Sequence, residues 1–187
     1  CKEGYLKMAE LIPKTSKNML DLGCGTGLEL DEIFKSFPNL KVTGIDLAKG
    51  MLDKLKEKHP NKDLTLINVN YFDYDLGNEI FDVAVSFETL HHFSHEEKIK
   101  LYNKLFKSLV KGGIYIEGDY MAPTQEYEDY YFAENKRIRS EMGITEGFYH
   151  YDTPCTVANQ IEMLKLAGFK TAKEVWQKGT VIIVAEK

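Results

Sequence analysis

A glycine-rich turn close to the start of the chain is the segment best suited to hold a ligand. The apolar run 18–22 leads into Asp21-Leu22-Gly23-Cys24-Gly25-Thr26-Gly27, and a helical pattern begins near Leu28. Glycines let the backbone turn tightly, so that its N–H groups and the start of the helix can face a bound molecule. Such a turn alone is a weak signal, because dinucleotide-binding domains also carry one.

The order of residues in this turn distinguishes between ligands. The glycines follow the spacing GxGxG rather than GxGxxG, and Asp21 stands just before them, where its carboxylate could pair with a cationic amino group. S-adenosylmethionine (SAM) has such an amino group on its aminoacyl tail and has no diphosphate. We therefore expect the turn to bind SAM rather than a nicotinamide or flavin dinucleotide.

A second carboxylate, Asp46, ends the apolar run 41–46 that follows the turn. A parallel strand at this place lies beside the first one, and a carboxylate about 20 residues after the turn accepts hydrogen bonds from ribose hydroxyls. The alternative is that Asp46 caps the helix predicted around Met51. We expect the ribose role, because the glycine turn supplies its context.

Four segments, in order along the chain, carry a family resemblance. Residues 20–27, Gly44-Ile45-Asp46, Phe81-Asp82-Val83 and Leu109-Val110-Lys111-Gly112-Gly113 resemble successive motifs of the class I SAM-dependent methyltransferases. Within that superfamily, residues 46–52 and Leu90-His91-His92-Phe93 are similar to the small-molecule branch that includes the ubiquinone and menaquinone C-methyltransferases. Residues 148–169 extend this similarity toward the end of the chain.

The resemblance implies a set of cofactor contacts, with SAM bound and S-adenosylhomocysteine as the product. Asn70 stands where this branch usually has an acidic residue that accepts a hydrogen bond from the adenine amino group, and an amide oxygen can still accept it. Asp73 is a competing candidate for that position. The cofactor-binding residues that the resemblance implies are Asp21, Gly23, Cys24, Gly25, Gly27, Asp46, Leu47, Met51, Asn70, Tyr71 and Phe87.

Candidate catalytic residues follow the fourth predicted strand. Methyl transfer from a sulfonium is an in-line displacement with an activated leaving group, so positioning of the acceptor can provide much of the catalysis. Where the acceptor must lose a proton, Glu88, His91 and His92 are placed to take part. Glu117 and Asp119, at the end of the fifth strand, are also near. The alternative for the two histidines is simple packing where the loop enters the next helix.

The segment 120–153 interrupts the regular alternation of elements and is rich in aromatic residues. It follows the carboxyl end of a strand, where open α/β sheets bind ligands, so we predict a lid over the acceptor. The alternative is a helix that packs its apolar stripe on the domain. Both arginines of the chain, Arg137 and Arg139, lie here on opposite helix faces, so at most one would grip an anionic acceptor. The candidate substrate-binding residues are Tyr127, Tyr131, Arg137 and Tyr149.

Alternating strands and helices must position these residues. Apolar β-prone runs alternate with helical patterns from Asn18 onward, which predicts a parallel sheet with helices on both faces. The turn around Lys178 and Gly179 is too short for a parallel crossover, so the last two strands form an antiparallel hairpin. Together with the resemblance, this predicts an α/β fold with a Rossmann-like seven-stranded mixed sheet, in the order 3-2-1-4-5-7-6 with the last strand antiparallel. The predicted strands are 18–22, 41–46, 64–68, 81–86, 113–119, 171–177 and 180–186, and the predicted helices are 28–37, 51–58, 96–110 and 157–166.

Composition limits the setting and the partners. The 187 residues are predicted to form one domain, and a net charge of −5 disfavours nucleic acid as a partner without excluding it. Cys1, Cys24 and Cys155 lack paired or metal-ligand spacing, so we expect neither a disulfide framework nor a metal site. The unpaired cysteines favour a reducing, cytoplasmic setting. No apolar run approaches a membrane span, so we expect no membrane partner. We expect a monomer or a homodimer. Because the chain begins with Cys1 rather than Met, we expect that an N-terminal segment is missing.

Three other functions stay open on the sequence. A non-catalytic SAM-binding regulatory domain would keep the glycine turn and Asp46 but lack an enclosed acceptor pocket. A SAM-dependent enzyme that modifies tRNA or nucleosides would need a basic, open mouth, whereas an aromatic cavity would suit a small molecule. A nicotinamide dehydrogenase is disfavoured by the spacing of the turn.

Overall fold

The computed structural model describes residues 2–145, 147 and 149–187, and its centre is one seven-stranded sheet in the order β3-β2-β1-β4-β5-β7-β6. β7 pairs antiparallel with both of its neighbours, whereas the other paired strands run parallel. The predicted fold class and strand order are therefore confirmed. The strands are β1 (Asn18–Leu22), β2 (Lys41–Asp46), β3 (Leu64–Asn68), β4 (Phe81–Phe87), β5 (Leu109–Asp119), β6 (Thr171–Lys178) and β7 (Thr180–Glu186).

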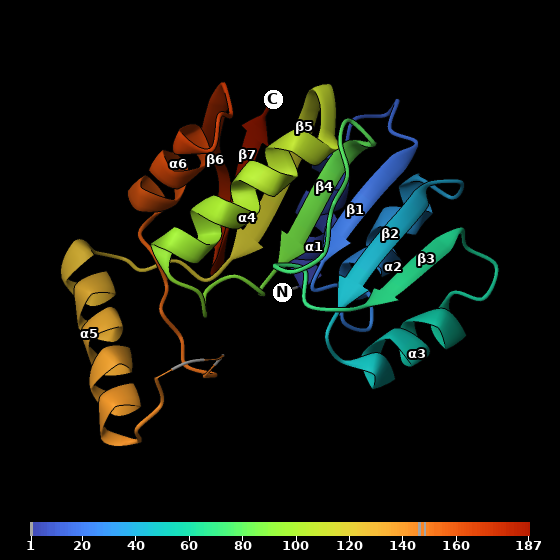
Figure 1. Cartoon of the computed structure of the whole chain (residues 1–187). Coiled ribbons are helices and arrows are strands. Elements are labelled where there is room, and N and C mark those ends of the chain that lie inside the picture. Colours follow the sequence, from blue (N-terminus) through green and yellow to red (C-terminus); the bar gives the residue numbers. More distant parts are fainter. Residues whose placement is uncertain (1, 146, 148) are drawn as a thin grey trace.

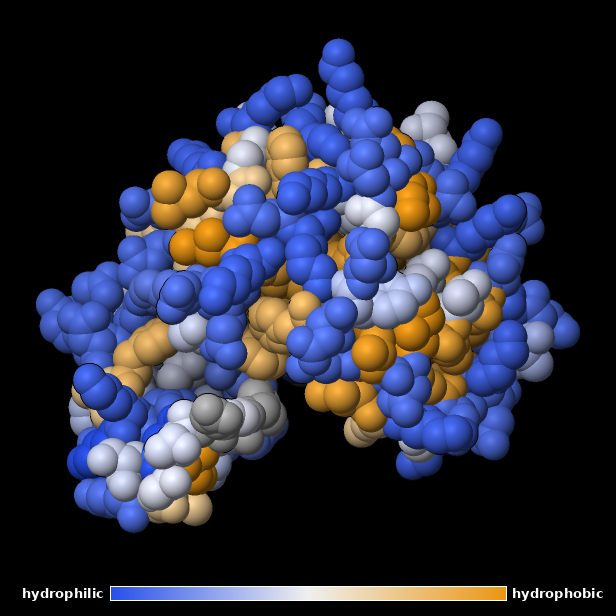
Figure 2. Space-filling view, viewed as in Figure 1, coloured by the Kyte–Doolittle hydropathy of each residue, from blue (hydrophilic) through white to orange (hydrophobic). Residues whose placement is uncertain are grey.

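Helices cover both faces of this sheet (Figure 1). α1 (Lys2–Leu11), α2 (Leu28–Ser36) and α3 (Lys49–Lys58) share one apolar cluster with the sheet, and α4 (His95–Ser108) and α6 (Val157–Leu166) share the other. The remaining helix, α5 (Gln125–Glu141), stands away from both layers, beyond the ends at which the parallel strands finish. In the space-filling view it forms part of a separate lobe at the lower left (Figure 2).

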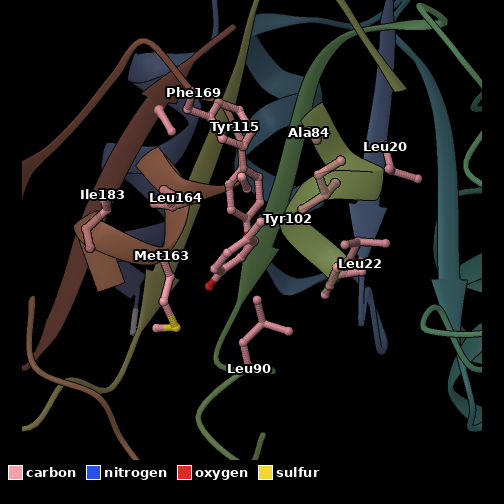
Figure 3. Close-up of a cluster of buried hydrophobic side chains, with 14 of the residues drawn as sticks. Leu20, Leu22, Ala84, Leu90, Tyr102, Tyr115, Met163, Leu164, Phe169 and Ile183 are labelled. Atoms are coloured by element: carbon pink, nitrogen blue, oxygen red, sulfur yellow. The ribbon is translucent and has the colours of Figure 1, made fainter. Parts of the chain in front are cut away.

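Two apolar cores fix the helices on the sheet. Tyr102 of α4 and Tyr115 of β5 lie fully buried at the centre of one core, between the sheet and α6 (Figure 3). Met8 and Ile12 anchor the N-terminal helix in the other core, which lies under α2 and α3. Large aromatic and aliphatic groups of this kind contribute on the order of 1.5–3 kcal/mol each when they leave water.

The predicted elements agree with the structure to within two residues, with two exceptions. β5 begins at Leu109 rather than at 113, because Leu109 pairs with Phe81 across an irregularity in the ladder with β4. The predicted helix 96–110 therefore ends earlier, at Ser108. α1 was not predicted, although Pro13 stands two residues after its last residue, Leu11, where a proline often follows a helix.

The predicted lid contains two residues that the structure does not describe. Glu146 and Phe148 lie outside the described residues, as does Cys1, so the predicted segment 120–153 is described without them. Across the described ranges, no helix combines the length and apolar character needed to cross a bilayer.

Candidate functional site

The glycine turn joins β1 to α2 at the carboxyl end of the sheet. Gly23, Gly25 and Gly27 have φ values of 68°, 49° and 67°, in the left-handed region that glycine tolerates best. A Cβ atom on Gly23 would lie 2.3 Å from Oγ1 of Thr89, and one on Gly27 would lie 2.5 Å from Cδ1 of Leu55. Both the backbone conformation and the close neighbours therefore require glycine in this turn.

The start of α2 is open toward the turn. Its N-cap residue is Gly27, which has no side chain to cap the first N–H groups. Uncapped N–H groups at a helix start carry partial positive charge and can receive an anionic group such as a carboxylate. The turn thus offers the kind of donors that the carboxylate of an aminoacyl tail would need.

Two buried carboxyl groups lie directly behind the turn. Asp21 is 1% exposed and Glu29 is 7% exposed, and the two carboxyl groups share a hydrogen bond. Within the described chain, Oδ2 of Asp21 and Oε1 of Glu29 accept no hydrogen bond from any N–H or hydroxyl group. Burial and the neighbouring Glu29 raise the pKa of Asp21 well above its ordinary value. Buried acceptors without partners are costly, so this pair fits a site that is completed by a cationic amino group.

Asp46 ties the turn to the end of β2. Its Oδ2 accepts a hydrogen bond from the backbone N–H of Gly25 at 2.9 Å, and its Oδ1 accepts one from that of Ala48 at 2.7 Å. The N-cap of α3 is Ala48, so the capping alternative for Asp46 is not what the structure shows. Each carboxylate oxygen has a second lone pair, which can accept a ribose hydroxyl.

The other predicted cofactor residues divide into exposed and buried groups. Leu47 and Met51 are 66% and 46% exposed, which leaves apolar surface beside Asp46 for a flat ring. Tyr71 is buried and its hydroxyl lies 3.2 Å from Oγ1 of Thr89, and Phe87 is buried against Tyr5 of α1. Cys24 packs its sulfur toward Gly44, so it would face a ligand with its backbone rather than its thiol.

A cavity of about 1110 Å³ extends from the end of β3 to α5. It is bounded by the loop after β4, by one side of α5 and by the segment that follows α5. The residues that matter most for its chemistry are Asn70, His92, Phe132, Lys136, Arg139 and Tyr149. Asp73 also lines it, so both candidates for the third-strand position face this space.

His91 is held by a buried carboxylate at the end of β5. Its Nδ1 lies 2.5 Å from Oδ1 of Asp119, which is 1% exposed and also accepts the backbone N–H groups of Leu90 and Tyr120. Burial opposes a charge on His91, but the hydrogen bond and the charges of Asp119 and Asp152 outweigh it and raise its pKa. The imidazole is thus fixed in orientation, with Nε2 turned to the loop after α5.

His92 and Glu88 differ in where they lie. His92 lines the cavity, and its Nδ1 lies 3.1 Å from Oδ1 of Asp152; burial, His91 and His150 lower its pKa to about 4. Glu88 accepts a hydrogen bond from the hydroxyl of Thr180 at the start of β7 and is not among the lining residues. Its φ of 50° marks a strained backbone at the end of β4.

Of the four predicted substrate-binding residues, one lines the cavity and three do not. Tyr149 lines the cavity, whereas Tyr127 and Tyr131 stack on each other at 4.6 Å and are not among the lining residues. Arg137 forms ion pairs with Glu134 and Glu141 on the exposed side of α5, and Arg139 lines the cavity, with Nη1 bonded to the carbonyl oxygen of Gly147 at 3.0 Å. Of the two arginines, Arg139 lines the cavity and Arg137 does not.

A buried polar network links α4, β5 and α6. Lys98 is 2% exposed and donates to Sγ of Cys155 at 3.4 Å and to Oε1 of Gln160 at 3.3 Å. Tyr102 and Gln160 both donate to the carboxyl of Glu117, which is fully buried. Burial raises the pKa of Glu117 to about 7, partly offset by Lys98. Glu117 is thus shielded from the cavity, and sequence patterns gave no sign of Lys98 or Gln160 as its partners.

The sequence is similar to a known protein family and to individual known proteins. Residues 19–113, slightly more than half of the chain, match a family described as a methyltransferase domain. The chain is 28% identical over 170 residues to a carboxy-S-adenosyl-L-methionine synthase of Nautilia profundicola, which covers 85% of this chain and 72% of that protein. It is 28% identical over 103 residues to a malonyl-[acyl-carrier protein] O-methyltransferase of Ilyobacter polytropus, which covers 54% of this chain and 37% of that protein.

One solved structure extends the likeness in fold to the whole chain. Human N-acetylserotonin methyltransferase in complex with SAM superposes with a TM-score of 0.72 and 17% identity, and covers 100% of this chain. The chain spans only 51% of that protein, so this similarity bears on the fold alone.

Proposed function

The chain belongs to the methyltransferase domain family and is a SAM-dependent methyltransferase, and from this premise we propose that its acceptor is a small molecule with a carboxylate group, bound in the cavity beside α5. The observation that carries the proposal is the placement of Arg139 and Lys136 on the cavity wall. Arginine binds carboxylates through two parallel N–H groups, and lysine adds a second positive charge. Phe132 supplies apolar surface on the same wall.

The glycine turn supports a defined set of roles toward the cofactor. Gly23, Gly25 and Gly27 would bring backbone N–H groups to the aminoacyl tail, Asp21 would receive its ammonium, and Asp46 would receive the ribose. When bound there, SAM supplies an activated methyl group. The chain's own contribution is then to hold the acceptor at the cavity and to keep water from it, which is the part of catalysis that positioning provides.

Among the predicted catalytic residues, the two histidines have better placement than Glu88. His92 lines the cavity, and His91 lies beside it, fixed by Asp119. Glu88 is engaged with Thr180 instead. We therefore keep His91 and His92 as the candidates that meet the reacting part of the acceptor.

The proposal draws support from charge and from the relatives. The overall charge of −5 gives no general field for a polynucleotide, and the cavity wall itself carries the carboxylates of Asp73 and Glu97 beside the cations Lys136 and Arg139, so any attraction for an anion is confined to the α5 side of the wall. One relative is named as a malonyl-[acyl-carrier protein] O-methyltransferase, and a malonyl group carries a carboxylate. This name supports the acceptor class without naming the acceptor of this chain.

A methyl-transfer assay tests the proposal. SAM labelled in its methyl group is incubated with the protein and with pooled small carboxylic acids, neutral metabolites and transfer RNA, and the labelled product is identified by mass. We expect label in a carboxylate-bearing small molecule. Label in transfer RNA alone would refute the acceptor class.

The two arginines provide a matched pair of variants for the same assay. Arg139→Ala should raise the KM for the acceptor by about tenfold or more, because it removes a charge-assisted contact. Arg137→Ala should leave KM unchanged, since Arg137 is paired with Glu134 and Glu141 away from the cavity. Both variants should bind SAM as the parent does. Equal effects of the two changes on KM would remove Arg139 from the acceptor site.

A second candidate follows from the relative that matches most of the chain, which is named as a carboxy-S-adenosyl-L-methionine synthase. In that case SAM itself would be the molecule modified, and the cavity would hold the co-substrate. The assay separates the two, because methyl transfer yields one S-adenosylhomocysteine for each methylated acceptor. Consumption of SAM with a heavier SAM derivative as the product would favour the second candidate.

A further inference from the structure

Two imidazoles and a carboxylate converge where the loop after β4 meets the segment after α5. Oδ1 of Asp152 lies 3.1 Å from Nδ1 of His92 and 3.8 Å from Nε2 of His91, and ligand atoms of the three residues lie within 4.8 Å of one another. The 3.8 Å separation is too long for a hydrogen bond. Two ligands of one ion, each about 2.0–2.1 Å from it, are separated by about 3–3.5 Å in tetrahedral or octahedral geometry. The spacing of this triad is therefore close to that of a shared ion.

We propose that His91, His92 and Asp152 bind a divalent first-row transition metal ion. Two histidines and one carboxylate form a ligand set that such ions prefer and that leaves further coordination positions open. The three residues come from two segments that the fold brings together. His91 and Asp152 are 61 positions apart in the sequence. The site is thus a product of the tertiary structure and not of a local motif.

The surroundings of His91 match those of a metal-binding imidazole. Nδ1 of His91 is engaged by Asp119, which leaves Nε2 directed to Asp152. Metal-binding histidines generally donate their second ring N–H to a carboxylate or a carbonyl, which fixes the ring and strengthens its binding. Asp119 is itself fixed by two backbone N–H groups, so it acts as a positioning residue.

A second cluster of the same residue types does not meet these conditions. His95, Glu128 and Cys155 also lie within 4.8 Å of one another. Glu128 already accepts hydrogen bonds from the backbone of Thr156 and from Asn159, and the ammonium of Lys98 lies 3.4 Å from the sulfur of Cys155. A nearby buried ammonium opposes a second cation, so we assign this cluster to structural support of α5.

The proposed ion would lie at the edge of the cavity, because His92 lines it and Thr153, next to Asp152, does so as well. An ion with open positions there could bind an oxygen of the acceptor and act as a Lewis acid. This role, unlike the binding of the ion, rests on the proposed function of the cavity. Metal binding and methyl transfer can therefore be tested separately.

Cobalt titration is the direct test. The protein, freed of any histidine tag and stripped with a chelator, is titrated with CoCl₂ while the visible d–d absorption and the heat of binding are followed. We expect saturation at one Co²⁺ per chain, competition by Zn²⁺, and no need for SAM. The Asp152→Ala and His91→Ala variants should bind Co²⁺ at least about tenfold more weakly, and Asp119→Asn about 10- to 100-fold more weakly.

Matched variants keep the test free of folding artefacts. The side chains of Asp152 and Asp53 are 51% and 57% exposed, so Asp53→Ala is the control for Asp152→Ala. The side chains of His91 and His59 are 13% and 14% exposed, so His59→Ala is the control for His91→Ala. Both controls should bind Co²⁺ as the parent does.

Two results would overturn the proposal: a parent protein without saturable Co²⁺ binding, or Asp152→Ala and His91→Ala variants that bind it unchanged. SAM affinity is measured on the same samples by calorimetry. A protein that binds SAM but not Co²⁺ would contradict the metal site and leave the proposed function intact. One that binds Co²⁺ and transfers no methyl group to any small molecule would contradict the proposed function alone.

Discussion

Two regions are built by different means: the glycine turn with Asp46, where we propose that SAM binds, and the cavity beside α5, where we propose that the acceptor binds. We call them the cofactor side and the acceptor side. Around the glycine turn, the backbone carries most of the site: three glycines with positive φ, the open start of α2, and Asp46 bonded to two backbone N–H groups. All of these lie within residues 21–48. Around the cavity, side chains from the loop after β4, from α5 and from the segment after it carry the chemistry.

This difference shows in how each side tolerates change. A site made of backbone fails when the chain can no longer follow its path, and few side-chain changes elsewhere affect it. A site made of side chains from distant segments depends on the anchoring of those segments. For α5 that anchoring is narrow, since Glu128 is its one buried residue among those described.

The largest effect is expected for Gly23→Ala, which tests the backbone character of the cofactor side. The new Cβ would lie 2.3 Å from Oγ1 of Thr89 and would hold φ near 68°. Overpacking and left-handed strain together should cost about 2–5 kcal/mol of stability, and SAM affinity should fall by more than about 100-fold. Urea unfolding and calorimetry measure the two quantities.

Gly112→Ala is the matched control for this change. Gly112 has a φ of 76°, but a Cβ there would have no described neighbour within 4 Å. It should lose about 1–2 kcal/mol of stability and keep its SAM affinity. Similar SAM affinities in the two variants would show that the close contact at Gly23 is unimportant. They would contradict the view that the backbone carries most of the cofactor side.

Glu117→Gln tests the buried polar network that links α4, β5 and α6. The ordinary carboxyl pKa of 4.5 is raised to about 7 in the folded protein, so the folded state holds this proton more tightly than the unfolded one. Its stabilising contribution is present below about pH 4.5 and is lost as pH rises through about 7. The variant should therefore gain stability relative to the parent by up to about 3 kcal/mol between about pH 5 and pH 8.

Unfolding by urea at several pH values gives this difference directly. Glu96→Gln is the control, because the side chain of Glu96 is 85% exposed. Parallel stability profiles of the parent and the Glu117→Gln variant would mean that the network holds Glu117 as a carboxylate throughout, and that Lys98 compensates its charge.

Asp46→Ala measures how much of the cofactor side depends on a side chain. The carboxylate should contribute about 1.5–3 kcal/mol to SAM binding through charge-assisted hydrogen bonds. Calorimetry with SAM and with S-adenosylhomocysteine should show the same loss for both, since they share the ribose. Asp53→Ala, an exposed aspartate of α3, is the control. Unchanged affinity in Asp46→Ala would move the ribose elsewhere.

The residues predicted for the cofactor side lie together at the glycine turn and the strand ends beside it, whereas those predicted for the acceptor side are only partly brought together, and the comparison explains why. The glycine spacing, Asp21 and Asp46 are local features, and each has a fixed place at the end of a strand. The partners Asp119 and Asp152 of the histidines are separated from them by 28 and more residues, so no spacing rule links them. Lys136 escaped notice for the same reason.

The choice between the two arginines illustrates a second limit. Their spacing showed that Arg137 and Arg139 point to different sides of a helix, but not which side meets the cavity. That orientation is set by how α5 is anchored, and α5 has no broad apolar stripe from which to infer it. On the outer side of α5, the guanidinium of Arg137 forms ion pairs with Glu134 and Glu141.

The smallest effect is expected in the hydrogen exchange of α5, where the anchoring itself can be observed. Near its start, Glu128 is bonded to Thr156 and Asn159 and lies 2.6 Å from Nε2 of His95, so this end is tied to the body. The rest of the helix has little buried surface and should open locally at low free energy. If α5 closes over the cavity, S-adenosylhomocysteine should slow exchange severalfold in residues 133–141, which corresponds to a rise of up to about 1 kcal/mol in the free energy of local opening. The exchange of residues 125–128 should change little. Amides of α4 serve as the internal reference, because that helix lies in the core. Equal exchange with and without the ligand along all of α5 would make this helix a fixed wall, and the acceptor side would then be as preformed as the glycine turn.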